Sequence, residues 1–140
     1  MTQAGAGGVH ATGLTRRFGD LTAVDDAHLD IAEGALFGLL GPDGAGKSTL
    51  IRLLATVLTP DAGDATVGGA SVTRRPDEVT PQIGYMSQQF CLYPDLTVAE
   101  NDFIFATIRG VPRAARRERA ASLTEAMGLA EFTRRQAGRL

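Results

Sequence analysis

Nine consecutive residues have the types and spacing needed to bind phosphate. Residues 41–49 read Gly-Pro-Asp-Gly-Ala-Gly-Lys-Ser-Thr and match the pattern G-x-x-x-x-G-K-[ST]. In such a loop, successive backbone N–H groups and the positive end of a helix dipole converge on phosphate oxygens. Gly44 and Gly46 are expected to let the backbone approach the ligand without a Cβ in the way. The alternative is an ordinary glycine-rich turn between a strand and a helix.

The end of this loop offers a positive charge and a metal ligand. Lys47 is expected to reach the β- and γ-phosphates, and the hydroxyl of Ser48 is expected to ligate Mg²⁺. Lys47 is also the only lysine among the 14 basic residues. A compact ammonium differs from a planar guanidinium in size and donor geometry, so a phosphate site can require lysine specifically. The predicted nucleotide-binding residues of the loop are Gly41, Asp43, Gly44, Ala45, Gly46, Lys47, Ser48 and Thr49.

The segments beside the loop are those that phosphate binding requires. Upstream, residues 35–40 form a short apolar run that is typical of a fully buried parallel strand. Downstream, leucine, isoleucine and valine recur at helical spacing over residues 50–58. The pattern therefore predicts a loop that joins a buried strand to the N-terminus of a helix.

Composition indicates a globular chain. Its 140 residues suffice for one domain or part of a larger one, and 44% of them are hydrophobic. The single Cys91 excludes an intramolecular disulfide, and no stretch approaches the roughly 18 apolar residues of a membrane span. Residues 1–8 are small and polar, without the features of a signal peptide. We expect a flexible N-terminus and a cytoplasmic location.

The net charge of −2 hides an asymmetry along the chain. Residues 1–102 contain six basic and 13 acidic side chains, whereas residues 103–140 contain eight basic and three acidic ones. The acidic part contains the loop, which argues against a nucleic-acid-binding surface. The basic part contains an arginine cluster that we interpret as a solvated helix face, with anionic lipid or an acidic partner as the alternative. The cluster consists of Arg109, Arg113, Arg116, Arg117 and Arg119.

Patterns elsewhere predict a β-rich part followed by a helical part. Residues 9–18 and 24–31 are predicted to form a β-hairpin, residues 65–67 a short strand, and residues 83–88 another buried strand. A brief helical segment is expected within residues 76–81.

Two longer helices are predicted after this β-rich part. Thr97 and Glu100 form a capping box that opens a helix ending at Gly110. A second helix is predicted from about Pro112 to Met127, and the last residues are expected to form a turn or short helix and a loop.

Together these motifs resemble the ATP-binding subunit of ABC transporters, from Val9 to the end of the chain. The matching segments are residues 41–49, 60–63, 83–88 and 92–101. The resemblance is nearest to the drug and antibiotic exporter branch. It implies an α/β, P-loop NTPase fold with an antiparallel β part, a nucleotide-binding core over residues 9–88 and a partial helical subdomain over residues 89–140.

The resemblance also implies ligands and partners. ATP and Mg²⁺ would be the cofactors, a transmembrane permease would contact residues 89–96, and a second ATP-binding subunit would complete a dimer. The protein would then lie on the inner face of the cell membrane, and nucleic acid is not an implied partner. Within residues 89–96, Phe90, Leu92 and Tyr93 would contact the permease or would belong to the core of the helical subdomain.

The resemblance also bears on the roles of three further residues. Phe18 stands where the family has an aromatic that stacks on adenine, with a hairpin-end core residue as the alternative. Gln88 matches a glutamine that contacts Mg²⁺ and the attacking water, so it is predicted to be catalytic and a metal ligand; the alternative is a solvated strand end. Asp43 replaces the family's commoner asparagine, and a carboxylate beside a triphosphate is unfavourable unless it points outward.

Several residues that the family needs for hydrolysis do not occur in this sequence. They are an Asp-Glu pair placed directly after an apolar strand, which would hold the Mg²⁺ water shell, a Ser-Gly-Gly signature and a switch histidine. His10 and His28 both precede the loop and are interpreted as structural. We expect the N-terminal portion of a longer domain, which binds Mg-ATP without hydrolysing it alone and exposes unpaired strand edges. The alternative is a non-hydrolytic nucleotide-binding or partner-docking fragment. A GTPase is disfavoured because no Asn-Lys-x-Asp motif occurs.

Overall fold

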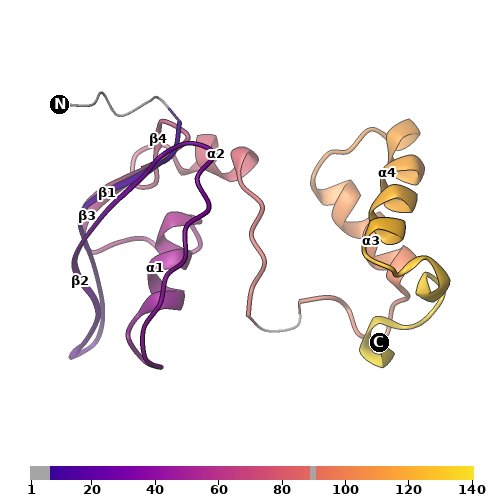
Figure 1. Ribbon diagram of the computed structural model, residues 1–140, viewed down its shortest axis with the longest axis horizontal. Coiled ribbons are helices and arrows are strands. Elements are labelled where there is room, and N and C mark those ends of the chain that lie inside the picture. Colours follow the sequence, from indigo (N-terminus) through magenta and orange to yellow (C-terminus); the bar gives the residue numbers. More distant parts are fainter. Residues whose placement is uncertain (1–6, 89–90) are drawn as a thin grey trace. The chain divides into compact units, whose positions relative to one another are not determined.

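The computed structural model describes residues 7–88 and 91–140 (Figure 1). Most of the predicted flexible N-terminus, residues 1–6, therefore lies outside the described residues. The chain divides into two compact units, Met1–Tyr85 and Met86–Leu140. The first contains all the strands, and the second contains the two longest helices.

The first unit is built on a four-stranded antiparallel sheet. Its strands are β1 (Val9–Phe18), β2 (Leu21–Ile31), β3 (Ala62–Val67) and β4 (Ala70–Ser71), in the spatial order β2-β1-β3-β4. The predicted hairpin is confirmed as β1 and β2, which are joined by a two-residue turn where Gly19 has a φ of 58°.

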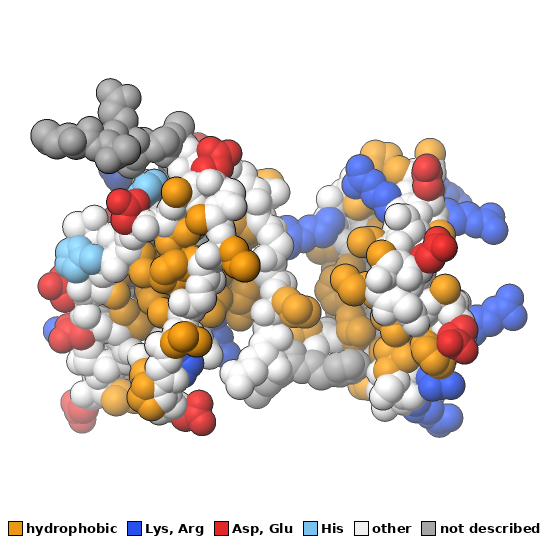
Figure 2. Space-filling view, viewed as in Figure 1, with side chains coloured by type: hydrophobic (Ala, Val, Ile, Leu, Met, Phe, Trp, Pro, Cys, Tyr) orange, Lys and Arg blue, Asp and Glu red, His pale blue; other side chains and the backbone are white. Residues whose placement is uncertain are grey.

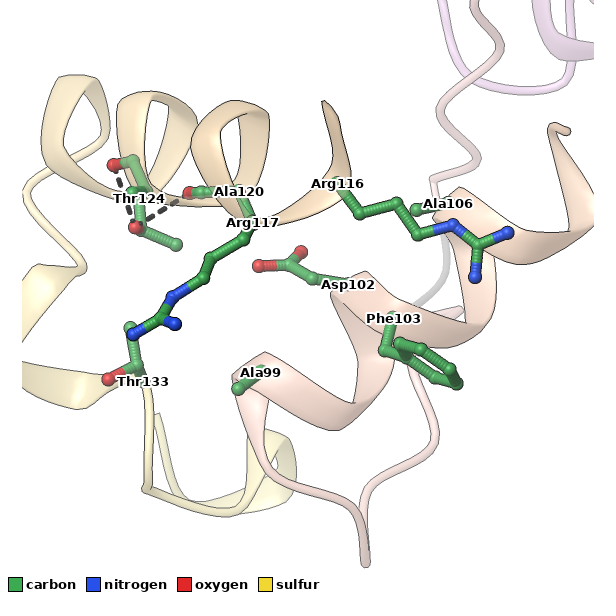
Figure 3. Close-up of a pocket in the computed structure, with 10 residues that line it drawn as sticks. Ala99, Asp102, Phe103, Ala106, Arg116, Arg117, Ala120, Thr124 and Thr133 are labelled. Atoms are coloured by element: carbon green, nitrogen blue, oxygen red, sulfur yellow. Dashed lines mark hydrogen bonds between the residues drawn. The ribbon is translucent and has the colours of Figure 1, made fainter. Parts of the chain in front are cut away.

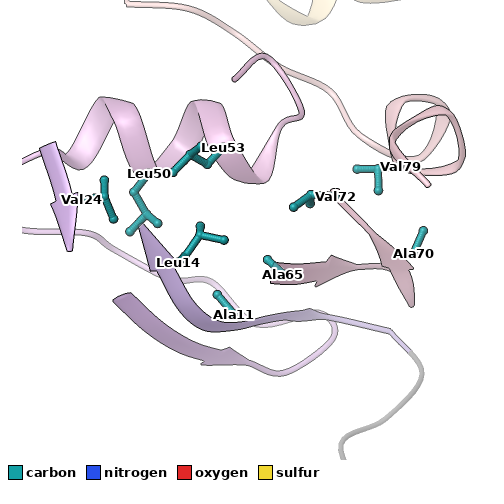
Figure 4. Close-up of a cluster of buried hydrophobic side chains, with 9 residues drawn as sticks. All are labelled: Ala11, Leu14, Val24, Leu50, Leu53, Ala65, Ala70, Val72 and Val79. Atoms are coloured by element: carbon teal, nitrogen blue, oxygen red, sulfur yellow. The ribbon is translucent and has the colours of Figure 1, made fainter. Parts of the chain in front are cut away.

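One helix covers this sheet and forms the core with it. Leu50 and Leu53 of α1 (Lys47–Leu54) are buried in one cluster with apolar residues of the sheet. A short helix, α2 (Pro76–Val79), adds Val79 and continues into the 3-10 turn η1 (Thr80–Gln82), which confirms the brief helical segment. Figure 4 shows the buried cluster, which contains Ala11, Leu14, Val24, Leu50, Leu53, Ala65, Ala70, Val72 and Val79.

The prediction of two further buried strands is wrong. Residues 35–40 and 83–88 are not strands, and no described strand pairs with either segment. An apolar run becomes a parallel strand only when neighbouring strands satisfy its N–H and C=O groups and helices cover its faces. Within the described residues, the sheet pairs elsewhere, so Leu36, Phe37, Leu40 and Met86 are exposed. In Figure 2, hydrophobic side chains gather on the visible face of this unit, at the left.

The first helix is also shorter than its apolar pattern predicts. It ends at Leu54, and Thr56 takes a left-handed conformation with a φ of 59°. The N–H groups of Val57 and Leu58 both donate to the Arg52 carbonyl, at 2.9 Å and 3.1 Å. The chain thus turns before Pro60, whose ring disfavours a helical conformation in the residue before it.

The second unit is a helical hairpin whose caps follow the prediction. The helices are α3 (Val98–Ile108) and α4 (Arg113–Ala126), followed by short 3-10 turns η2 (Ala130–Phe132) and η3 (Ala137–Arg139). The hydroxyl oxygen of Thr97 accepts from the Glu100 N–H at 3.2 Å, while the Glu100 carboxylate accepts from the Thr97 N–H at 2.8 Å. Donation by the Thr97 N–H lowers the pKa of the Glu100 carboxyl, and the two reciprocal bonds confirm the capping box. Gly110 and Gly128, with φ values of 67° and 68°, follow the helix ends.

We predict that the chain self-associates through residues 35–40. Leu36 and Leu40 are 103% and 93% exposed, whereas Leu39 packs against the core. An extended apolar segment with unpaired backbone groups is a template for pairing with another chain. The double variant Leu36→Gln/Leu40→Gln should shift sedimentation at micromolar concentration toward the monomer without lowering the thermal midpoint. Leu39→Gln is the matched control and should lower that midpoint. A wild-type chain that is monomeric at every concentration contradicts this prediction.

Candidate functional site

The loop before α1 takes the path that the glycine pattern predicts. Gly44 and Gly46 have φ values of 79° and 81°, in the left-handed region that side chains disfavour. Between them, the Ala45 N–H donates to the Pro42 carbonyl at 3.3 Å, which closes a tight turn. The Leu50 N–H donates to the Gly46 carbonyl at 2.9 Å, so the helix begins directly after the loop.

A close approach to the sheet explains why Gly46 has no side chain. A Cβ built on Gly46 would overlap the carbonyl oxygen of Ala23 on β2, whereas a Cβ on Gly44 would meet no atom within 4 Å. Gly46 therefore lets the loop lie directly against the backbone of β2, whereas Gly44 is needed only for the left-handed conformation of the turn. Val24, the next residue of β2, belongs to the core, so the loop is anchored where the sheet is packed.

Lys47 curls back over its own loop. Its Nζ donates to the carbonyl oxygens of Gly41 and Pro42 at 2.8 Å and 2.6 Å. Across the described part of the chain, no carboxylate forms an ion pair with this ammonium. The loop therefore carries a positive charge that two neutral carbonyl dipoles solvate and no anion compensates.

The start of α1 adds backbone donors to this charge. The first N–H groups of a helix have no intrahelical acceptor, and Gly46 as N-cap has no side chain to satisfy them. The first turn contains no acidic residue. Ser48 and Thr49 lie in the first turn of α1, at the positive end of the helix dipole. Ser48 is exposed and Thr49 is half-buried. Asp43 is exposed as well.

A pocket of about 230 Å³ lies beside the loop. Its walls come from β2, from the segment that precedes the loop and from the loop itself. Its lining includes Ala23, Val24, Leu39, Ala45, Gly46 and Lys47. The loop thus borders a hollow rather than a flat surface.

Phe18 ends β1 in the same unit and pairs with Leu21 across the hairpin turn. Its side chain is 45% exposed, so it is not a core residue. The guanidinium carbon of Arg16 lies 4.9 Å from the centre of its ring. Sequence reasoning missed Arg16, although the two-residue period of a strand places residues 16 and 18 on one face.

The structure places Gln88 in the other unit. Gln88 lies in a bend, and its side chain is exposed. Of the segment predicted to contact a permease, residues 89 and 90 lie outside the described residues. Tyr93 is 52% exposed and Leu92 is half-buried.

Figure 3 shows a pocket of about 300 Å³ between α3 and α4. Asp102 points from α3 toward α4, and burial raises the pKa of its carboxyl. The Arg116 guanidinium stacks over Phe103 at 5.5 Å and donates to the Val111 carbonyl and the Thr107 hydroxyl, both at 2.7 Å. These contacts hold the hairpin together, and none of the predicted site residues lines this pocket.

Residues 7–88 and 91–140 contain no group of three or more His, Cys, Asp or Glu side chains that could hold a metal ion. Mg²⁺ in nucleotide sites is bound by one or two protein groups plus phosphates and water, so the Ser48 hydroxyl fits that type of site. No helix in the same residues is long and apolar enough to cross a membrane.

Comparison with protein families matches residues 24–140 to the family described as ABC transporter. The chain belongs to this family. The match begins within β2 and includes the loop of the first unit and the helical hairpin of the second.

Curated relatives include ATP-binding proteins named for multidrug transport, drug resistance and import. The chain is 45% identical over 130 residues to the probable multidrug ABC transporter ATP-binding protein YbhF of Escherichia coli (strain K12), covering 91% of this chain and 22% of that protein. It is 41% identical over 123 residues to the daunorubicin/doxorubicin resistance ATP-binding protein DrrA of Streptomyces peucetius, covering 88% and 37%. It is also 40% identical over 122 residues to the spermidine/putrescine import ATP-binding protein PotA of Nitrosomonas europaea, covering 87% and 34%. The chain thus spans between about a fifth and two fifths of these relatives.

Solved ABC structures share the fold. A dimeric ATP-binding cassette in a post-hydrolysis state, bound to ADP and Pi, matches with a TM-score of 0.80 and 26% identity, covering 94% of this chain and 62% of that one. An ATP-binding subunit of an ABC transporter matches with a TM-score of 0.78 and 22% identity, covering 92% and 54%. The predicted α/β, P-loop NTPase fold of ABC type is confirmed.

Replacing either glycine of the loop by alanine should lower the free energy of unfolding, but by different amounts. Gly44→Ala should lower the free energy of unfolding by about 1–2 kcal/mol, because a left-handed residue acquires a Cβ in open space. Gly46→Ala should cost clearly more, because its Cβ must also displace the Ala23 carbonyl. Urea denaturation of both variants measures the difference. Equal costs would show that the contact with β2 does not fix the loop.

Proposed function

We propose that the chain binds the triphosphate of Mg-ATP through residues 41–49 and forms part of the ATP-binding subunit of an ABC transporter. The observation that carries this proposal is the environment of Lys47: its ammonium has no carboxylate partner among the described residues, and its loop leads into the start of α1. An uncompensated cation beside unsatisfied N–H donors is the electrostatic environment that a phosphate group needs.

Each residue of the site has a separate task in binding. Gly44 and Gly46 hold the loop so that its N–H groups face the phosphates, and Ala45 and Thr49 lie at its turn and at the helix start. Lys47 would exchange its two carbonyl contacts for oxygens of the β- and γ-phosphates. Bound Mg²⁺ would neutralise part of the phosphate charge, and the Ser48 hydroxyl is the group of this loop that would hold it.

Other parts of the proposal rest on the resemblance to the family. Gln88 would orient the attacking water and contact Mg²⁺, and Phe18 would stack on the adenine. Residues 89–96 would contact a transmembrane permease, and a second ATP-binding subunit would complete the dimer on the inner face of the membrane. The core would extend over residues 9–88 and the helical subdomain over residues 89–140.

An export system is the favoured context. The multidrug and drug-resistance relatives match at 45% and 41% identity, and a polyamine import relative at 40%. We therefore propose an exporter on the names of the first two relatives. A chain that binds nucleotide without hydrolysing it is the second candidate, because an Asp-Glu pair directly after an apolar strand, the Ser-Gly-Gly signature and the switch histidine do not occur in this sequence.

Lys47→Ala should weaken Mg-ATP binding roughly 10- to 100-fold, since hydrogen bonds to a charged group are lost. Isothermal titration calorimetry of the 140-residue chain measures this affinity. Arg52→Ala is the matched control, because it removes a cation from the last turn of the same helix and should leave the affinity unchanged. Equal affinities for wild type and Lys47→Ala would refute the phosphate site.

A phosphate-release assay on the same samples separates the two candidate functions. We expect no turnover by this chain alone. Turnover that disappears in Lys47→Ala would show that the residues present are sufficient for hydrolysis.

A further inference from the structure

We propose that Arg16 is a positioning residue for the nucleotide base: held by Asp61 and the Thr59 carbonyl, it fixes Phe18 and strengthens stacking of adenine on the opposite face of the ring. The proposal rests on the proposed function, because it needs a nucleotide on the phosphate loop. It goes further by naming the contacts that would set affinity for the base rather than for the phosphates.

Arg16 is held in place by groups from a distant segment. Its Nη1 donates to the Thr59 carbonyl at 3.0 Å and to the Asp61 carboxylate at 3.1 Å. Its side chain is only 25% exposed, and its Nε is buried with no hydrogen-bond partner among the described residues. A guanidinium fixed on two acceptors and partly desolvated has lost most of its freedom to leave the ring of Phe18.

Asp61 also fixes the backbone beneath the aromatic residue. Its second carboxylate oxygen accepts from the Arg17 N–H at 2.6 Å, one residue before Phe18. The Asp61 N–H in turn donates to the Thr15 carbonyl at 2.9 Å. The end of β1 is thereby tied to the loop that follows α1, the helix that starts at the phosphate loop.

One face of the Phe18 ring is covered, and the residue remains accessible. The Arg16 guanidinium lies 4.9 Å from the ring centre, within the range of a cation–π interaction, while Phe18 is 45% exposed. A cation on one face leaves the other for a planar ligand and draws electron density from the ring, which favours stacking on an electron-rich base. Phenylalanine has no hydroxyl to orient a base, so the rigidity of the ring carries more weight here.

The pairing of β1 and β2 connects this ring to the phosphate loop. Arg16 pairs with Val24, which lines the pocket beside Gly46 and Lys47. The Asp61 carboxylate compensates the charge of Arg16 at 3.1 Å. Arg16 should therefore act on the base and contribute little to attraction of the triphosphate, which distinguishes it from Lys47.

Calorimetric titration of the 140-residue chain with Mg-ATP and with magnesium tripolyphosphate tests this distinction. Arg16→Gln should weaken ATP binding roughly 2- to 5-fold, the value of one partly exposed cation–π contact, and leave tripolyphosphate binding unchanged. Arg17→Gln is the matched control, because it removes the same charge from the neighbouring residue and should change neither affinity. Arg16→Lys retains the cation and should recover part of the ATP affinity.

Phe18→Ala should abolish the preference for ATP over tripolyphosphate, and Arg16→Gln should have no further effect in that background. Equal weakening of both ligands by Arg16→Gln, no effect on either ligand, or an equal effect of Arg17→Gln would overturn the proposal. Failure of the wild-type chain to bind either ligand would instead overturn the proposed function on which it rests.

Discussion

The close approach of Gly46 to the carbonyl of Ala23 is the constraint on which the site depends. It forces a residue without a Cβ at the N-cap of α1 and sets the left-handed turn before the helix. Because α1 then packs Leu50 and Leu53 into the core, the position of the helix start is fixed by the same packing that stabilises the sheet. The site is thus rigid because the fold is packed directly beneath it.

A second consequence is electrostatic. A helix that begins on a glycine has no side-chain acceptor for its first N–H groups. The first turn of α1 contains no acidic residue, and no ion pair within residues 7–88 and 91–140 involves Lys47, so the positive potential is not reduced there. Lys47 adds a whole charge to this partial one, and its ammonium donates to two carbonyls of the loop. The loop without a ligand therefore has a positive electrostatic potential, which an anion with several oxygens would neutralise.

Local sequence patterns correctly predicted the features that depend on interactions between residues close in the sequence. The glycine loop, the Thr97 capping box and the caps at Gly110 and Gly128 depend on a few neighbouring residues, and they are found where they were expected. The strands predicted at residues 35–40 and 83–88 depend on partner strands, which an apolar run cannot specify. Asp61 was missed as a partner of Arg16 because the two lie 45 residues apart, and no local pattern connects them.

The central claim is that residues 41–49 bind the phosphates of a nucleotide, and a crystal structure of the chain with Mg²⁺ and a non-hydrolysable ATP analogue tests it most directly. We predict that the Lys47 ammonium leaves the carbonyls of Gly41 and Pro42 and contacts the β- and γ-phosphates, while the loop backbone stays on β2. Nucleotide phosphates bound away from the loop, with Lys47 still on its two carbonyls, would contradict this account.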